Sequence, residues 1–182
     1  ADEFLGTWRT HEQAFPKSFP GAFETKLGYT RVLTAAVQGL LEKAGVEPRQ
    51  LATVILPTPG PRAPLAVAKA LGLDPRTQLQ DGFWTTLGDT GAAQPLLMLA
   101  AALERARAGD LLLVAGYGDG ADALLLRATG APGGGGTSVS RQIEVKRTLP
   151  SYGRYARFRR LMRKEPAAPD ASNPRGRPPG KP

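Results

Sequence analysis

Hydrophobic positions along the chain switch between helical and extended spacing. Over residues 28–45 apolar side chains recur every three or four positions, which predicts an amphipathic helix that ends at Gly45. Residues 51–56 (LATVIL) are a short continuous apolar run, which is typical of a buried strand. A second helix is predicted over residues 61–71, because a proline opens it and a glycine follows it.

The next stretch repeats this pattern with a longer helix and a hairpin. A further short strand is predicted over residues 77–80. Residues 92–108 are apolar on nearly all sides, which predicts a helix packed on several sides inside the protein. Residues 111–115 (LLLVA) predict a strand buried on both faces, and residues 121–129 its partner after a glycine-rich turn at 116–120. The order α-β-α-β-α-β-β predicts a layered α/β unit.

The last part of the chain has a different composition. Residues 131–138 (APGGGGTS) predict a flexible linker, and alternating β-branched residues predict a short edge strand over 139–149. Residues 151–164 (SYGRYARFRRLMRK) predict an amphipathic helix with an aromatic row and a basic outer face. Residues 165–182 are rich in Pro, Gly and Arg without apolar periodicity, which predicts disorder.

The net charge of +8 and the sequence pI of about 10.2 first suggest a nucleic-acid partner. However, residues 1–130 carry 12 Lys and Arg against 13 Asp and Glu, whereas residues 131–182 carry 12 against 3. Because the excess charge lies in the tail and not on a folded face, the globular part is not expected to bind nucleic acid. Binding by the tail alone remains an alternative, and it would show a steep salt dependence.

Two absences narrow the classes of function. The 182 residues contain no cysteine, so no disulfide, thiolate metal site or cysteine nucleophile exists within this sequence. No apolar run approaches the roughly 20 residues that cross a bilayer, and the first residues do not form a signal peptide, so we expect no membrane partner and a cytoplasmic location.

Three segments in order resemble the C-terminal half of the thiolase superfamily. They are PTPGPRAPLAVAKALGL at 57–73, GDTGAAQPLLMLAAALERARAGD at 88–110 and VAGYGDGAD at 114–122. The branch they most resemble comprises the 3-hydroxy-3-methylglutaryl-CoA (HMG-CoA) synthases and class III ketoacyl synthases. The resemblance implies a layered α-β-α thiolase half over residues 1–130. The composition of the remaining residues predicts a linker with a short strand over 131–150, a basic helix over 151–164 and a disordered tail over 165–182.

The same resemblance implies where a site would lie. In this family the first half supplies a nucleophilic cysteine, and the second supplies a histidine and an asparagine or second histidine. The histidine position falls on Pro57 or Thr58, and the asparagine position on Asp89, which is the catalytic candidate. The glycine loop matches the family, and its backbone N–H groups are expected to bind the acyl group. The implied substrate-binding residues are Gly116, Tyr117, Gly118 and Gly120.

Each of these residues also has a purely structural interpretation. Asp89 would cap the helix that starts near Thr90, and the glycines would only allow a tight turn. His11 lies in a polar segment and is expected in a solvated loop. Three other carboxylates are expected in turns and are too scattered for a metal site: Asp81, Asp119 and Asp122.

The resemblance therefore implies part of an acyl-CoA acyltransferase that is not active alone. A coenzyme A thioester would be the substrate of the intact assembly, with no bound cofactor or metal. The expected partner is the missing cysteine-bearing half or a paralogous synthase subunit, within a homo- or hetero-oligomer. The alternative is a non-catalytic scaffold that docks an active synthase or an OB-fold partner. Residues 151–164 resemble the helix that leads into a zinc-ribbon and OB-fold acyl-CoA-associated domain, although no cysteines follow.

Overall fold

The computed structural model describes residues 4–57, 60–118, 120–130 and 136–162. The chain divides into two compact units, Ala1–Val145 and Lys146–Pro182. The predicted tail at 165–182 and most of the glycine linker lie outside the described residues. Within the described ranges, no helix has the length and apolar character needed to cross a membrane.

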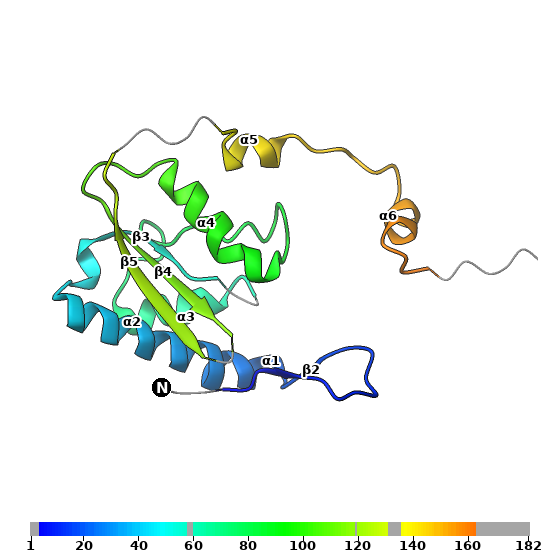
Figure 1. The fold of residues 1–182 in the computed structure, drawn as a ribbon, viewed down its shortest axis with the longest axis horizontal. Helices are drawn as coiled ribbons and strands as arrows, with labels where there is room; N and C mark the ends of the chain where they lie inside the picture. The colour runs from blue at the N-terminus through cyan, green and yellow to red at the C-terminus, as the bar shows by residue number, and fades with distance from the viewer. Residues whose placement is uncertain (1–3, 58–59, 119, 131–135, 163–182) are drawn as a thin grey trace, which may run out of the picture. The chain divides into compact units, whose positions relative to one another are not determined.

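The first unit is organised around a sheet of order β3-β4-β5 (Figure 1). Strand β3 (Leu51–Ile55) runs parallel to β4 (Leu111–Tyr117), and β4 runs antiparallel to β5 (Ala121–Arg127). These three strands confirm the sequence predictions. The strand predicted at 77–80 is present only as an isolated parallel bridge between Val54 and Leu79.

The hairpin turn is shorter than predicted, because Gly116 and Tyr117 belong to strand β4. The prediction that Asp122 is a turn residue is wrong: it lies in β5, where it pairs with Gly116. Asp81, in contrast, is a turn residue, and its Oδ1 accepts the Phe83 N–H at 3.0 Å. Asp119 lies outside the described residues.

Helices cover both faces of the sheet. On one face lie α2 (Arg31–Ala44), which continues η1 (Glu24–Thr30), and α3 (Ala63–Leu71). On the other lies α4 (Gln94–Leu103). Side chains of β4 alternate between two buried clusters: Leu113 and Ala115 pack with α2 and α3, and Leu112 and Val114 pack with α4. The predicted α-β-α layering is confirmed, as is the burial of β4 on both faces.

Glycines end two of the helices at the predicted positions. Gly45 follows α2 with φ 63°, and Gly72 follows α3 with φ 69°. This left-handed backbone is available to glycine without a steric penalty, so a glycine after a helical pattern is a dependable stop signal. The helix predicted at 28–45 continues further toward the N-terminus, through η1 and the short α1 (Gly21–Phe23).

Helix α4 differs from its prediction in length and burial. It is preceded by a single 3-10 turn, η3 (Gly91–Ala93), and it ends at Leu103 rather than Ala108. Met98, Ala101 and Ala102 are buried, but Leu96 is 68% and Leu103 is 49% exposed. One apolar side of α4 therefore has no cover among the described residues.

The prediction of a strand over 139–149 is wrong, because residues Val139–Glu144 form helix α5. Ser138 is its N-cap, and the Ser138 hydroxyl oxygen accepts the Arg141 N–H at 3.2 Å. Glu104, at the end of α4, accepts the Val139 N–H as well, and Val139 is buried. Two acceptors for the free N–H groups of the first turn outweigh the alternating β-branched pattern.

The second unit contains helix α6 (Tyr152–Phe158), with Ser151 as N-cap. It confirms the predicted helix at 151–164, although the helix is shorter. The predicted aromatic row is solvent-exposed within this unit. Its members are 41–82% exposed: Tyr152, Tyr155, Phe158, Leu161 and Met162.

The first residues form a two-stranded hairpin of β1 (Thr7–Trp8) and β2 (Lys17–Ser18). Four aromatic rings pack next to it, with Trp8 and Phe19 at 4.9 Å and Phe19 and Phe23 at 5.2 Å between centroids. Residues Pro48–Gln50 form the short η2 before β3. The hairpin leads the chain past the ends of β3 and β4, where the candidate site lies.

Asp74 holds the loop that leads to the bridge at Leu79. Its carboxylate accepts the Thr77 hydroxyl at 2.7 Å and the Arg76 N–H at 3.0 Å, and these hydrogen bonds lower the pKa of Asp74. Because the folded-state pKa lies below the unfolded one, the stabilisation is present above the unfolded pKa and is lost as the pH falls through the folded pKa.

We therefore expect Asp74→Asn to lower the free energy of unfolding at neutral pH. The difference from the wild-type chain should shrink toward zero in acid, where the native carboxyl is protonated as well. Urea unfolding at a series of pH values measures this. A difference of constant size down to the acid limit would contradict the assigned hydrogen bonds.

Candidate functional site

A cleft of about 660 Å³ lies at the carboxyl ends of β3 and β4. Parallel strands end at the same edge of a sheet, which is where open α/β folds commonly bind ligands. Pro57 follows β3, Asp89 precedes α4, and Gly116, Tyr117 and Gly118 end β4; all five line the cleft. The structure thus brings residues of the three sequence motifs into one hollow.

The other predicted positions lie elsewhere. Gly120 is not among the lining residues of the cleft, and Thr58 lies outside the described residues. His11 lines a separate shallow hollow in the loop between β1 and β2, together with Arg9 and Gln13. It is exposed, in agreement with the predicted solvated loop.

Asp89 has a structural role that the geometry defines. Its Oδ1 accepts the Gly91 N–H at 2.7 Å, so it satisfies one of the free N–H groups at the start of η3 and α4. The N-cap position itself is Thr90, whose side chain makes no capping bond. Asp89 therefore stabilises the start of the helix as predicted, but it does so from the position before the N-cap residue. A carboxylate here is also favoured by the helix dipole.

The glycine loop is less available than the resemblance implies. The Gly118 N–H donates to the carbonyl oxygen of Gly120 at 2.9 Å, so it serves the hairpin turn. Binding of an acyl group by this N–H group stays a prediction, and it requires that the turn release the hydrogen bond to Gly120. The adjacent Tyr117 also lines the cleft, but its hydroxyl oxygen is buried.

The lack of a side chain at Gly6 and Gly28 makes room for the Tyr117 side chain. A Cβ atom on Gly28 would lie 2.3 Å from the Tyr117 hydroxyl oxygen and 2.5 Å from a ring carbon of Phe4. A Cβ atom on Gly6 would lie 3.6 Å from the same hydroxyl oxygen. The Tyr117 ring also meets Tyr29 edge-on, with 5.4 Å between centroids. Helix η1 and the N-terminal segment therefore fix Tyr117 at the cleft.

Sequence reasoning missed Glu24, which also lines the cleft. It is half-buried, and its Oε1 would lie 3.0 Å from a Cβ atom on Gly6. Among the described residues, the cleft lining contains two carboxylates, those of Glu24 and Asp89, and no lysine, arginine or histidine. Glu24 lies outside all three motifs and before the helix predicted at 28–45, so no sequence signal pointed to it.

A carboxylate-lined cleft is a poor environment for a developing negative charge, which needs N–H donors or cations. It also lacks a metal-binding geometry: among the described residues, no group of three or more His, Asp or Glu side chains could hold an ion. Pro57 has no group that titrates. The cleft can therefore enclose a ligand, but those of its lining residues that the structure describes offer no imidazole or thiol for proton or acyl transfer.

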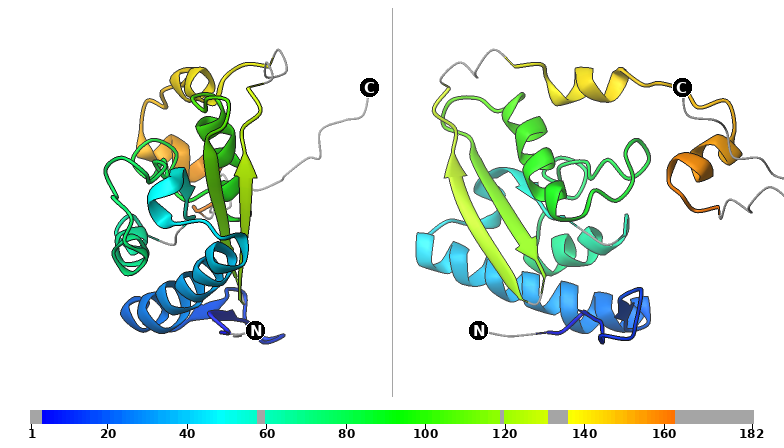
Figure 2. Two further views of the ribbon diagram at one scale, coloured as in Figure 1. Left: turned by 90° about the vertical axis from the view of Figure 1, so that its left-hand side faces the viewer. Right: turned by 45° about the vertical axis from the view of Figure 1, so that its right-hand side comes forward.

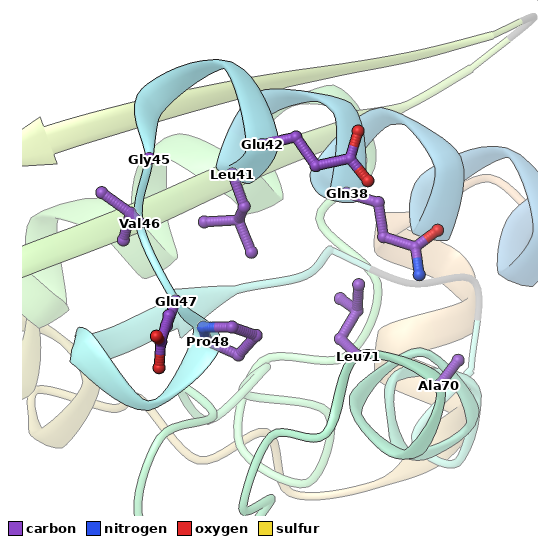
Figure 3. A pocket seen from close by; sticks show the side chains of 9 residues that line it. All are labelled: Gln38, Leu41, Glu42, Gly45, Val46, Glu47, Pro48, Ala70 and Leu71. Atoms are coloured by element: carbon purple, nitrogen blue, oxygen red, sulfur yellow. The ribbon is translucent and has the colours of Figure 1, made fainter.

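A second groove of about 310 Å³ lies where α2 and α3 end (Figure 3). Leu41, Val46 and Leu71 form its apolar floor, and Glu42 and Gln38 extend along its rim. Only the first motif reaches this groove, through Ala70 and Leu71, whereas all three motifs meet in the cleft at the strand ends, which is therefore the candidate site.

Comparison with known proteins identifies the family. Residues 41–127 match the family model described as 3-oxoacyl-[acyl-carrier-protein (ACP)] synthase III C terminal. The hydroxymethylglutaryl-CoA synthase of Methanococcoides burtonii is 32% identical over 127 residues, which are 67% of this chain and 35% of that protein. The corresponding synthase of Methanosarcina mazei is 28% identical over 171 residues, covering 86% of this chain and 46% of that protein.

Solved structures show the same fold. The 3-oxoacyl-[acyl-carrier-protein] synthase III of Aquifex aeolicus superposes with a TM-score of 0.57 at 25% identity, over 68% of this chain and 40% of that one. The enzyme of Pseudomonas aeruginosa gives 0.59 at 20% identity, over 67% and 39%. The chain spans between about a third and a half of the length of these relatives. It belongs to the thiolase superfamily, as a C-terminal half that resembles the hydroxymethylglutaryl-CoA synthases and the class III ketoacyl synthases.

Proposed function

We propose that this chain is the C-terminal half of an HMG-CoA-synthase-like acyltransferase, which joins acyl units carried as coenzyme A thioesters by forming a carbon–carbon bond. One observation carries the proposal: Pro57, Asp89 and the end of β4 meet in a single cleft, in the order and positions of the family motifs. The similarity to hydroxymethylglutaryl-CoA synthases supports the substrate class. We further propose that the assembly works in the cytoplasm.

The chemistry requires groups that this chain lacks. A condensing enzyme needs a thiolate that accepts the acyl group, a base that removes a proton from the second substrate, and donors for the oxyanion. The chain has no cysteine, and Pro57 or Thr58 stands where the family histidine is expected. In the proposed assembly, this half encloses the thioester, and the cysteine and the base come from another polypeptide segment.

The uncovered side of α4 is the proposed contact for that segment. Leu96 and Leu103 are exposed although they belong to a helix whose opposite side is fully packed. Exposed apolar residues on a helix of this composition favour burial against a second protein surface. The N-terminal end of α4 lines the cleft through Gln94 and Pro95, so a half that packs along α4 would reach the reacting atoms.

A cation near the cleft suits the phosphates of coenzyme A. Arg62, just before α3, lines a hollow of about 500 Å³ with Ser18 and Phe19. Glu24 lines both this hollow and the cleft, so the two are adjacent. An arginine next to a helix N-terminus is a favourable site for a phosphate group.

The second unit favours the alternative function, a scaffold that docks an active synthase or an OB-fold acyl-CoA-binding partner. Residues 146–162 contain six lysines and arginines and no Asp or Glu. The aromatic row of α6 is exposed between these cations. Such a helix fits an apolar groove with an acidic rim. Under this alternative, Phe158→Asp would abolish binding of the partner and leave the first unit unchanged.

The two functions are separated by restoring the family residues. The cysteine-bearing N-terminal half of the Methanococcoides burtonii synthase would be co-expressed with the Pro57→His/Asp89→Asn variant. The rate at which the complex releases CoA from acetyl-CoA and acetoacetyl-CoA would then be measured. A positioned base and an amide donor should raise turnover by at least about 100-fold over the wild-type pair. Leu65→His, which adds an imidazole on the exposed side of α3, is the matched control and should give no gain.

If the complex forms and the double variant is no faster than the Leu65→His control, the cleft is not a catalytic site and the scaffold alternative stands. Complex formation is checked by size-exclusion chromatography of each pair. Binding that depends on Phe158 and not on the cleft residues would identify the scaffold directly.

A further inference from the structure

Residues 81–90 form a loop without helix or strand, which leads into the N-terminal end of α4 (Figure 2). Two of its polar side-chain atoms, Trp84 Nε1 and Thr90 Oγ1, are buried and have no hydrogen-bond partner among the described residues. Phe83 has φ 59°, a left-handed backbone that is unfavourable for a residue other than glycine. A loop with two unsatisfied polar groups and one strained residue stores free energy that a second conformation can release.

Thr90 occupies the N-cap position of η3, but its backbone keeps it from capping. Threonine is a preferred N-cap residue, and its hydroxyl oxygen accepts an N–H of the first helical turn when the N-cap backbone is extended. Here Thr90 has ψ 8°, which is far from extended, and its side chain makes no capping bond. The Ala93 N–H, which the hydroxyl oxygen of an extended Thr90 would accept, instead donates to the carbonyl oxygen of Thr90 at 3.3 Å.

Two other helices of the chain show the geometry of a capping hydroxyl. Ser138 has ψ 152° at the N-cap of α5, and Ser151 has ψ 157° at the N-cap of α6. In both helices the serine hydroxyl oxygen accepts the N–H of the residue three positions later, at 3.2 Å. Thr90 with an extended backbone would cap in the same way, with Ala93 as the donor.

We propose that the start of α4 has two alternative caps, Asp89 and Thr90, and that their exchange releases the Asp89 carboxylate into the cleft. In the observed state Asp89 Oδ1 accepts the Gly91 N–H at 2.7 Å, and the Thr90 hydroxyl is idle. In the second state Thr90 is extended, its hydroxyl oxygen accepts the Ala93 N–H, and Asp89 leaves Gly91. Gly88 and Gly91 flank the two moving residues, and glycine tolerates the change in backbone angles.

The exchange bears on the cleft because Asp89 is one of its lining residues. A carboxylate that caps a helix can bind a ligand only by giving up its hydrogen bond, which leaves the helix with one acceptor fewer. With Thr90 as the second cap, α4 keeps a side-chain acceptor while Asp89 turns to the ligand. A ligand that brings an N–H group or a cation to Asp89 favours this state, because it binds only the released carboxylate. The exchange does not depend on the acyl chemistry proposed for the cleft.

A double-mutant cycle in the full chain tests the exchange, with the unfolding equilibrium constant of the first unit as the readout. Asp89→Ala should raise this constant less than about threefold, because Thr90 then takes over the cap and only the favourable charge is lost. Thr90→Val keeps the shape of the side chain and should not raise the constant, since the hydroxyl is idle in the observed state. In the Thr90→Val background, Asp89→Ala should raise it at least about tenfold, because no side-chain cap remains.

Hydrogen exchange of the Ala93 amide reports the second state directly. In the Asp89→Ala variant this amide should exchange at least about fivefold more slowly than in the double variant, because only the single variant keeps the Thr90 hydroxyl as its acceptor. If Asp89→Ala raises the unfolding constant by the same factor in both backgrounds, Thr90 is not a second cap and the proposal is overturned. Equal exchange of the Ala93 amide with and without the Thr90 hydroxyl overturns it as well.

Discussion

Replacing Leu113 with alanine should lower the free energy of unfolding of the first unit by about 2–5 kcal/mol. Leu113 is fully buried at the middle of β4, between Val54 on one neighbouring strand and Leu125 on the other. Its side chain belongs to the cluster under α2 and α3, so its removal leaves a cavity that rigid neighbours on two strands and two helices cannot fill. For a domain of ordinary stability this is a large share of the total.

Chemical denaturation followed by circular dichroism measures the change, with Leu65→Ala as control. Leu65 is half exposed on α3, and alanine is a good helix former, so the control should stay within about 0.5 kcal/mol of the wild-type chain. Equal effects at the two positions would mean that β4 is not the central strand of the core, and the layered architecture would then be wrong.

Gly28→Ala is expected to destabilise the unit by about 1–3 kcal/mol, although alanine is normally better than glycine in a helix. The new Cβ atom would lie 2.3 Å from the Tyr117 hydroxyl oxygen, so Tyr117 or helix η1 must move. Gly39→Ala is the matched control in α2. Nothing lies within 4 Å of a Cβ atom there, and we expect a gain of about 0.5–1 kcal/mol.

The two glycine substitutions are expected to change the stability in opposite directions, and this difference tests whether Tyr117 packs against η1 at the wall of the cleft. Thermal unfolding of both variants, compared with the wild-type chain, gives the signs directly. If Gly28→Ala is as stabilising as Gly39→Ala, Tyr117 does not pack against η1, and the cleft lacks the wall described above. Tyrosine fluorescence would report the displaced Tyr117 ring in the destabilised variant.

The fold was largely predictable because its signals are local. Gly45 and Gly72 mark the ends of α2 and α3, and the apolar run at 111–115 marks the central strand. The failures come from contacts between distant residues. Helix α5 depends on Glu104, 35 positions from Val139, and a β-branched pattern gives no sign of that acceptor.

The candidate site was predictable in position but not in chemistry. The family motifs placed Pro57, Asp89 and Tyr117, and the parallel arrangement of β3 and β4 brings them together. The motifs could not indicate that the Gly118 N–H is used within the turn. Nor could they place Glu24 at the cleft, since that depends on how helix η1 packs across the strand ends.

The central claim is that this half of a condensing enzyme has the cleft of the family without the groups that react. The most direct test is the release of free CoA from acetyl-CoA and acetoacetyl-CoA by the purified wild-type chain alone. The account predicts no release above the uncatalysed rate, because the chain has no cysteine and the position of the family base is taken by Pro57 or Thr58. Sustained release that is lost in Asp89→Ala would contradict it and would make this chain an enzyme in its own right.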